Sequence, residues 1–363
     1  MAIVPKQITD ILRSVKFPGS EENVVELDMV QEIRIAGTRI SFTLVFQKDN
    51  DPNIQNVAQA CAEAIEDELG SEVEISITPK AIHRMQAPVL PGVKNTIAVA
   101  SGKGGVGKST VAVNLAVALA KTGAKVGLID ADIFGPSVPK MFDEENARPV
   151  MTKVEGRDLI VPVEKYGVKL LSIGFFVNKE DALVWRGPMA SNALKQLLIE
   201  ADWGELDYLL IDMPPGTSDI HLTLVQTIPV TASVIVTTPQ EVALADVVKG
   251  VAMFNSKSVD VPVLGIIENM SWFTPAELPD SKYYIFGKDG GKELAEQLEI
   301  PLLGQIPLVM SIREGGDSGV PAASKEDSLT GQAFLEVAEQ VVHRLDLRNK
   351  FFKPSRKVKT ERK

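Results

Sequence analysis

The sequence predicts an α/β fold in which helices cover both faces of a mostly parallel sheet, with a small α+β domain in front of it. From Asn95 onward, short uninterrupted aliphatic runs alternate with helical patterns, as expected of parallel strands that are buried on both faces. Polar motifs follow these runs directly, at the edge of such a sheet where ligands bind. The residues before Asn95 follow a different pattern, and the length of 363 residues also favours two domains.

The small α+β domain is predicted over residues 1–80. Apolar side chains at helical spacing indicate two helices, Val4–Val15 and Asn53–Leu69. Alternating or β-branched runs indicate three strands, Met29–Ala36, Arg39–Phe46 and Val73–Ile77. Residues 81–94 contain two prolines and a glycine and are therefore predicted to be a linker.

The larger α/β domain is predicted over residues 95–346. Helical patterns such as Ser109–Lys121 and Ala243–Phe254 lie between several of its aliphatic runs. Six runs indicate buried strands: Thr96–Ala100, Val126–Ile129, Tyr208–Ile211, Ser233–Thr237, Val263–Ile267 and Leu302–Ile306.

Composition excludes several classes of protein. No apolar run approaches the roughly 18–20 residues of a membrane span, and no export signal is evident, so we expect a cytoplasmic protein without a membrane partner. The single cysteine, Cys61, excludes an internal disulfide and a metal site built from several cysteines of one chain.

The charge is unevenly distributed. The net charge is −10, yet residues 348–363 contain eight basic residues and one acidic residue. The remaining acidic body is a poor general binder of nucleic acid, so we expect no specific nucleic-acid partner. Residues 347–363 could touch RNA, DNA or acidic lipid, but a disordered tail is the simpler interpretation.

A phosphate-binding loop follows the first strand of the larger domain. Gly102, Gly107, Lys108 and Ser109 occupy the defining positions of the Walker A pattern between a strand and a helix. The pattern predicts that Lys108 binds the β- and γ-phosphates and Ser109 binds Mg²⁺. The predicted ATP-binding residues of the loop are Gly102, Lys103, Gly104, Gly105, Val106, Gly107, Lys108, Ser109 and Thr110.

A dinucleotide-binding site is the alternative interpretation of this loop. Gly102, Gly104 and Gly107 have the spacing of the dinucleotide fingerprint, and Asp130 follows the next strand. An NAD(P) oxidoreductase would use these residues without Mg²⁺. That interpretation does not require Lys108 and Ser109, and it leaves a second acidic motif after a later strand unexplained.

Lys103 resembles the signature lysine of the deviant Walker A class of P-loop NTPases, which includes MinD, ParA and the nitrogenase iron protein. The resemblance implies a homodimer in which Lys103 crosses to the partner's nucleotide. A cation supplied in this way would stabilise the charge that develops during ATP hydrolysis. Lys103 and Lys108 are therefore both predicted to be catalytic.

Acidic residues end two of the predicted strands. Asp212 ends a hydrophobic run and is followed by Pro214-Pro215-Gly216, which is the Walker B design for holding Mg²⁺ through water. Resemblance to the same class implies that Asp132 orients the attacking water and that Asp130 has a structural or Mg²⁺-binding role. It also implies that Asn269, expected to close its strand, contacts the adenine base.

Three longer strings resemble the Mrp/ApbC family of iron–sulfur cluster carrier ATPases. They are Asp130-Ala-Asp-Ile-Phe-Gly-Pro-Ser137, Asp212-Met-Pro-Pro-Gly-Thr-Ser-Asp219 and Glu268-Asn-Met-Ser271. The resemblance covers about residues 95–345, and the N-terminal domain resembles the one that bacterial members carry in front. It implies ATP and Mg²⁺ as cofactors, a [4Fe-4S] cluster, and apo iron–sulfur client proteins or assembly scaffolds as partners.

The chain departs from this family at one place. Members carry a Cys-x-x-Cys pair shortly after the Asn-Met-Ser string, and two chains supply four thiolates to a bridging cluster. Here Pro275 and Leu278 stand at about those positions. Either the chain holds clusters by other ligands, such as Cys61 across a dimer, or it has lost cluster binding. The second case would leave a ParA- or MinD-like nucleotide-dependent switch.

Overall fold

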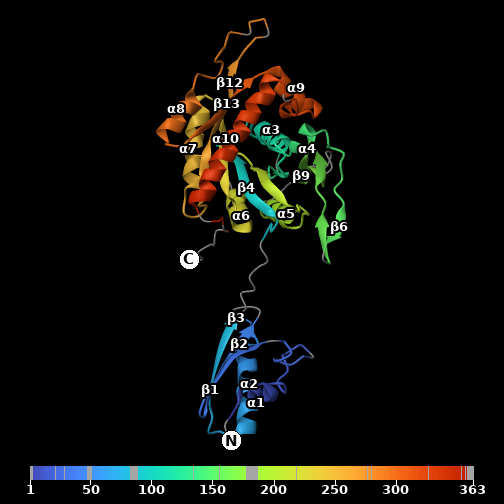
Figure 1. The fold of residues 1–363 in the computed structure, drawn as a ribbon, viewed down its shortest axis with the longest axis vertical. Helices are drawn as coiled ribbons and strands as arrows, with labels where there is room; N and C mark the ends of the chain where they lie inside the picture. The colour runs from blue at the N-terminus through green and yellow to red at the C-terminus, as the bar shows by residue number, and fades with distance from the viewer. Residues whose placement is uncertain are drawn as a thin grey trace. The chain divides into compact units, whose positions relative to one another are not determined.

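The computed structural model describes residues 3–20, 22–27, 29–46, 51–81, 89–133, 135–154, 156–176, 187–217, 219–275, 277–278, 280–325, 327–352, 354–355 and 357. The chain divides into two compact units, Met1–Pro88 and Val89–Lys363. This division falls within residues 81–94, where the linker is predicted. Figure 1 shows both units.

The first unit packs two helices, α1 (Pro5–Leu12) and α2 (Ile54–Leu69), with a three-stranded sheet. The strands are β1 (Val30–Ala36), β2 (Arg39–Phe46) and β3 (Glu74–Ala81). β1 and β2 pair antiparallel, whereas β2 and β3 pair parallel because α2 connects them. The predicted small α+β fold is confirmed, although α1 ends at Leu12 rather than Val15.

The core of this unit forms where the sequence alternates or repeats with helical period. The apolar face of β2 and the inner sides of both helices are almost fully buried together. The main contributors are Ile40, Phe42, Leu44 and Phe46 from β2, Ile8 and Leu12 from α1, and Val57, Cys61 and Ile65 from α2.

The second unit is built on an eight-stranded sheet with the order β13-β12-β11-β4-β10-β5-β9-β8. Every neighbouring pair is parallel except the edge hairpin β8–β9, so the predicted mostly parallel sheet is confirmed. The strands are β4 (Val93–Ala100), β5 (Val126–Asp130), β8 (Val163–Lys165), β9 (Val168–Ser172), β10 (Leu206–Asp212), β11 (Ala232–Thr237), β12 (Val263–Phe273) and β13 (Leu302–Leu308).

Helices cover both faces of this sheet. On β4, Ile97 and Val99 face one hydrophobic core, whereas Ala98 and Ala100 face the other. The first core contains side chains of α3 (Lys108–Lys121) and α10 (Leu329–Phe351). The second contains side chains of α5 (Gly187–Ile199), α6 (Asp219–Thr227), α7 (Glu241–Phe254) and α8 (Gly290–Gln297).

Shorter elements complete the unit. A two-stranded ribbon consists of β6 (Met151–Val154) and β7 (Arg157–Ile160), and it was not predicted. The remaining helices are α4 (Val138–Met141), α9 (Met310–Ser318), and the 3₁₀ turns Ile173–Phe175 and Ala322–Ser324. Among the described residues, no helix is long and apolar enough to cross a membrane.

The C-terminal helix corrects the predicted start of the tail. α10 continues to Phe351, so residues 347–351 are helical. The buried stripe that includes Phe334, Val341 and Leu345 fixes the helix against the sheet. Its last turn also carries Arg348 and Lys350, which interact favourably with the negative end of the helix dipole.

Candidate nucleotide-binding site

The phosphate-binding loop connects the end of β4 at Ala100 to the start of α3 at Lys108. Gly107 precedes the helix with a φ of 82°, a left-handed conformation that favours glycine. A Cβ atom on this residue would also collide with Nδ2 of Asn269. Both constraints require glycine at this position. The loop leads directly into the N-terminus of α3, which is the positive end of the helix dipole.

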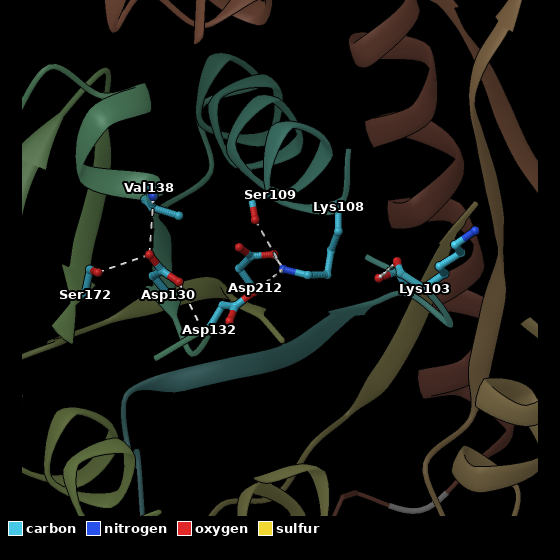
Figure 2. Close-up of polar contacts among 9 residues, drawn as sticks. Lys103, Lys108, Ser109, Asp130, Asp132, Val138, Ser172 and Asp212 are labelled. Atoms are coloured by element: carbon cyan, nitrogen blue, oxygen red, sulfur yellow. Dashed lines mark hydrogen bonds and ion pairs between the residues drawn. The ribbon is translucent and has the colours of Figure 1, made fainter. Parts of the chain in front are cut away.

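Lys108 lies at the base of the loop and is almost completely buried. Its Nζ is 2.6 Å from Oδ1 of Asp212 and 3.2 Å from Oγ of Ser109. Asp132 is farther away, with Oδ2 at 4.0 Å from the same nitrogen. Figure 2 shows these side chains converging from α3, β10 and the segment after β5. The structure thus brings together four of the residues that the sequence predicted at the site.

Two buried carboxylates lie at neighbouring strand ends. Asp212 of β10 pairs in register with Asp130 of β5, and both side chains are completely buried. Burial raises the pKa of Asp212, and the nearby Lys108 opposes that rise. Burial also raises the pKa of Asp130, to about 8, with a further contribution from the charge of Asp212.

Both carboxylate oxygens of Asp130 accept hydrogen bonds from within the chain. Its Oδ2 accepts from Oγ of Ser172 at 3.0 Å and from the backbone N–H of Val138 at 3.3 Å. Its Oδ1 accepts from the backbone N–H of Asp132 at 3.2 Å. These contacts, drawn in Figure 2, hold both ends of the segment 131–138, so the geometry favours the structural role for Asp130 over Mg²⁺ binding.

Two adjoining clefts lie over the loop. The first has a volume of about 230 Å³ and is lined by Lys108, Ser109 and Asp132 among others. The second has a volume of about 320 Å³ and a largely apolar lining that includes Met270, Leu308 and Ile312. Gly107, Thr110, Ser137 and Met141 line both clefts. A polar cleft that continues into an apolar one matches the phosphates and the base of a nucleotide.

Asn269 lies inside β12 rather than at the end of its strand, which corrects the prediction. β12 continues to Phe273 through an irregularity at Met270, whose φ is 56°. The Asn269 side chain is buried, and its Nδ2 donates to the backbone oxygen of Val106 at 2.9 Å. Asn269 therefore braces the phosphate loop and lines the apolar cleft.

Lys103 is exposed, unlike Lys108. In Figure 2 its side chain points away from Lys108 and Asp212. The hydroxyl of Ser101 donates to the backbone oxygen of Lys103 at 3.0 Å, which fixes the loop beneath the lysine. Lys103 thus lies apart from the buried cluster around Lys108.

The oxygen donors beside Lys108 fit a magnesium ion that also binds nucleotide phosphates. Oδ2 of Asp212 is buried and makes no hydrogen bond with the described residues, and the Ser109 hydroxyl lies nearby. Mg²⁺ prefers a few carboxylate and hydroxyl oxygens together with water and phosphate. A dedicated protein cage is not present: the described residues contain no group of three or more His, Cys, Asp or Glu side chains able to hold a metal.

Among the residues that the structure describes, no thiolate is positioned to bind an iron–sulfur cluster. Cys61 is buried in the core of the first unit, and burial raises the pKa of its thiol to about 12. Pro275 and Leu278, which replace the family's cysteine pair, lie in the segment that follows β12. The chain therefore does not fit thiolate ligation at that place, and Cys61 would have to leave its core to serve as a ligand.

Sequence reasoning missed part of the site. Ser172 was not identified, although it ends the strand β9 (Val168–Ser172) just as Asp130 and Asp212 end theirs. The rule that polar strand ends mark the site applies to it, but Lys169 interrupts the apolar signal by which the strand itself would be recognised. The apolar residues of the second cleft gave no such signal, because Leu308 and Ile312 resemble ordinary core residues.

The fold and this site together define a P-loop nucleotide-binding protein. Comparison with known proteins then gives the family. The sequence profile of the NUBPL iron-transfer P-loop NTPases matches residues 92–342, and that of a family of iron–sulfur cluster assembly proteins matches residues 5–77. The chain belongs to the NUBPL-type iron-transfer P-loop NTPases, which confirms the resemblance seen in the sequence.

Individual relatives agree with this assignment. An iron–sulfur cluster carrier protein from Synechocystis is 43% identical over 94% of this chain and 97% of its own length. One from Escherichia coli is 52% identical over 71% of this chain and 69% of its own. Among solved structures, a nucleotide-binding protein from Archaeoglobus fulgidus in complex with ADP has a TM-score of 0.57 and 36% identity, and it covers 68% of this chain and 94% of its own.

Proposed function

We propose that this chain is a homodimeric, Mg²⁺-dependent ATPase of the cytoplasm that acts in the assembly or transfer of iron–sulfur clusters to apoproteins. The observation that carries the proposal is the buried arrangement of Lys108, Ser109 and Asp212 beneath two adjoining clefts. Family membership, and relatives that are named iron–sulfur cluster carriers over nearly the whole chain, support the cluster role.

Each polar residue has a distinct part in this proposal. Lys108 binds the β- and γ-phosphates, in competition with its ion pair to Asp212. Ser109 and, through water, Asp212 would hold Mg²⁺, which neutralises phosphate charge when bound. Asp132, at the edge of the phosphate cleft, orients the attacking water. Asp130 anchors the segment that carries Asp132.

The remaining residues position the nucleotide. The backbone N–H groups of residues 102–110 surround the phosphates, and Asn269 contacts the base from the wall of the apolar cleft. Lys103 serves the nucleotide of the partner subunit, a role supported by its exposure and its direction in Figure 2. Because one subunit would supply the positive charge that stabilises hydrolysis in the other, hydrolysis would be coupled to dimerisation.

A second candidate function is a ParA- or MinD-like nucleotide-dependent switch that holds no cluster. The burial of Cys61 and the absence of cysteine from residues 270–287 favour it. In the first function the chain carries the cluster as cargo. Residues other than the family's cysteine pair then bind the cluster, for example residues of the client protein. In the second, the ATPase cycle controls only the binding of partners.

Iron measurements together with a transfer assay test the proposal. The full chain is reconstituted anaerobically with iron and sulfide, and iron per dimer is compared with ATP turnover and with activation of an apo iron–sulfur protein. Mg²⁺-dependent turnover with ATP-dependent activation of the apoprotein supports the proposal. Turnover without any effect on the apoprotein supports the switch, and absence of turnover contradicts both.

A further inference from the structure

One stretch of chain after β5 reaches both clefts over the phosphate loop. Asp132, near its start, lines the polar cleft, whereas Met141 in α4 lines the polar and the apolar cleft. Ser137, just before α4, also lines both. We call residues 131–142 the bridging segment. It carries both the carboxylate proposed to orient the attacking water and a part of the wall proposed to hold the base.

Asp130 ties two parts of the bridging segment to one carboxylate. Its oxygens accept from the backbone N–H of Asp132 at 3.2 Å and from that of Val138, the first residue of α4, at 3.3 Å. The Ser172 hydroxyl of β9 holds the same carboxylate at 3.0 Å, as Figure 2 shows. A shift of α4 therefore moves a donor that shares its acceptor residue with the backbone of Asp132.

α4 is packed so that it moves as a unit. Val138 and Phe142 are completely buried, whereas Met141 is only half-buried, at the wall of the clefts. α9 packs against α4, and a Cβ on Gly319 at the end of α9 would collide with Asp143. Because close-packed side chains have little room to give, a base that contacts Met141 fixes the position of α4 as a whole.

The opposite contributors to the apolar wall lie outside the bridging segment. Leu308 ends β13 in the central sheet, and Ile312 belongs to α9. A base that packs against Leu308 contacts a strand of the sheet, so this contact contributes to affinity. A base that packs against Met141 contacts the segment that carries Asp132. Two residues of one cleft thus differ in what the base affects through them.

We propose that Met141 is a positioning residue that makes the rate of ATP hydrolysis depend on the nucleotide base. The base packs against Met141 and fixes α4, α4 holds the Val138 N–H on Asp130, and Asp130 holds Asp132 beside the attacking water. The chemical step is unchanged: water attacks the γ-phosphorus and ADP leaves. Binding energy from the remote base is used to orient the reacting groups. The inference rests on the proposed ATPase and adds a requirement of its site for the base.

Single-turnover hydrolysis and equilibrium binding of Mg-ATP and Mg-triphosphate by the full chain test this role. Met141→Ala and Leu308→Ala are a matched pair, because each shortens a half-buried apolar side chain of the same cleft. We expect Met141→Ala to lower the saturating rate with ATP by about tenfold or more, whereas Leu308→Ala raises the Kd of ATP and saturating ATP overcomes its loss. Met141→Leu, which conserves side-chain volume, should restore the rate.

Inorganic triphosphate supplies the control without a base. The wild type should hydrolyse it about tenfold or more slowly than ATP at saturation, and Met141→Ala should not slow it further. Hydrogen exchange gives a readout apart from turnover. A non-hydrolysable ATP analogue should protect the amides of the bridging segment more than triphosphate does in the wild type, and Met141→Ala should remove that difference.

The outcomes separate this inference from the proposed function. Equal saturating rates for ATP and triphosphate in the wild type overturn the inference alone, because the base then contributes only affinity. A Met141→Ala variant that changes the Kd of ATP without changing the saturating rate or the exchange pattern overturns it as well. A wild-type chain that hydrolyses neither compound contradicts the proposed ATPase and the inference with it.

Discussion

Lys108 and Asp212 form a buried ion pair with 2.6 Å between Nζ and Oδ1, and this pair joins the start of α3 to the end of β10. Neither side chain exceeds 6% exposure. The pair therefore has two roles, since it stabilises the fold beneath the loop and holds the cation where phosphates bind. Stability and nucleotide binding must therefore be measured separately in variants of these residues.

Lys108→Ala is expected to abolish ATP binding and to destabilise the second unit. Removing one partner of a buried pair leaves an uncompensated carboxylate, which typically costs about 3–5 kcal/mol. Calorimetric titration with ATP and urea unfolding measure the two effects. In the double variant Lys108→Ala/Asp212→Asn, part of the lost stability should return while ATP binding stays absent. Recovery of binding in the double variant would argue against a phosphate contact by Lys108.

Lys103→Ala is expected to leave ATP binding nearly unchanged and to stop turnover. An exposed side chain that points away from its own cleft contributes little to binding there, whereas a charge supplied in trans to phosphoryl transfer accelerates it by about 10³–10⁵-fold. Single-turnover kinetics and equilibrium binding measure the difference. Mixing Lys103→Ala with Lys108→Ala should restore some activity, because the mixed dimer contains one site with both lysines. An equal loss of binding in both single variants contradicts the trans role.

Asp130→Asn is expected to flatten the pH dependence of stability. Burial raises the pKa of Asp130 from 3.8 to about 8, so the folded chain retains a proton that the unfolded chain has released. The contribution of this group to stability is therefore fully present below pH 3.8 and is lost as the pH rises to about 8. Urea unfolding between pH 5 and 8 should show the wild type losing stability relative to Asp130→Asn. Parallel curves would mean that Asp130 is ionised throughout this range.

The fold was predictable because its signals are local and strong. Largely aliphatic runs such as Val126–Ile129 and Ser233–Thr237 are typical of strands inside a sheet covered on both faces, and the glycine-rich loop fixes which strand precedes α3. The edge hairpin β8–β9 escaped prediction because its three- and five-residue strands carry Glu164 and Lys169 among apolar residues. A strand that is only partly covered loses the continuous apolar signal.

The site was predictable in its members but not in its contacts. Strand-end acids and loop lysines follow a pattern that is visible in the sequence. The different roles of Asp130 and Asp132 depend on hydrogen bonds from Ser172, which is distant in the sequence, and from the backbone of Val138, which no sequence pattern specifies. The contact of Asn269 with Val106 likewise depends on the continuation of β12 past Asn269. Tertiary packing decides such details.

Asn269→Ala is expected to weaken binding of both ATP and GTP by about tenfold through the phosphate loop, and to weaken ATP further because the contact with the adenine base is also removed. The side chain donates a buried hydrogen bond to Val106 in the phosphate loop, and loss of such a bond leaves the Val106 oxygen unsatisfied at a cost of about 1–3 kcal/mol. Loosening the loop affects every nucleoside triphosphate equally. Comparing the Kd values of ATP, GTP and inorganic triphosphate measures this effect. A loss confined to ATP would show instead that Asn269 acts only by contacting the adenine base.

Cys61→Ala is expected to lower stability slightly without changing iron content. The thiol is buried in the core of the first unit, so its removal leaves a small cavity and costs about 1 kcal/mol. Because burial raises its pKa to about 12, the native thiol should react with an aromatic disulfide reagent only as fast as the unit unfolds. Thiol release in water and in urea, together with iron per dimer for both proteins, measures these expectations. A cluster that binds wild type and disappears with Cys61→Ala would show that the core opens to supply the thiolate. Iron that is retained in the variant would place the cluster ligands elsewhere, in another side chain or in the client.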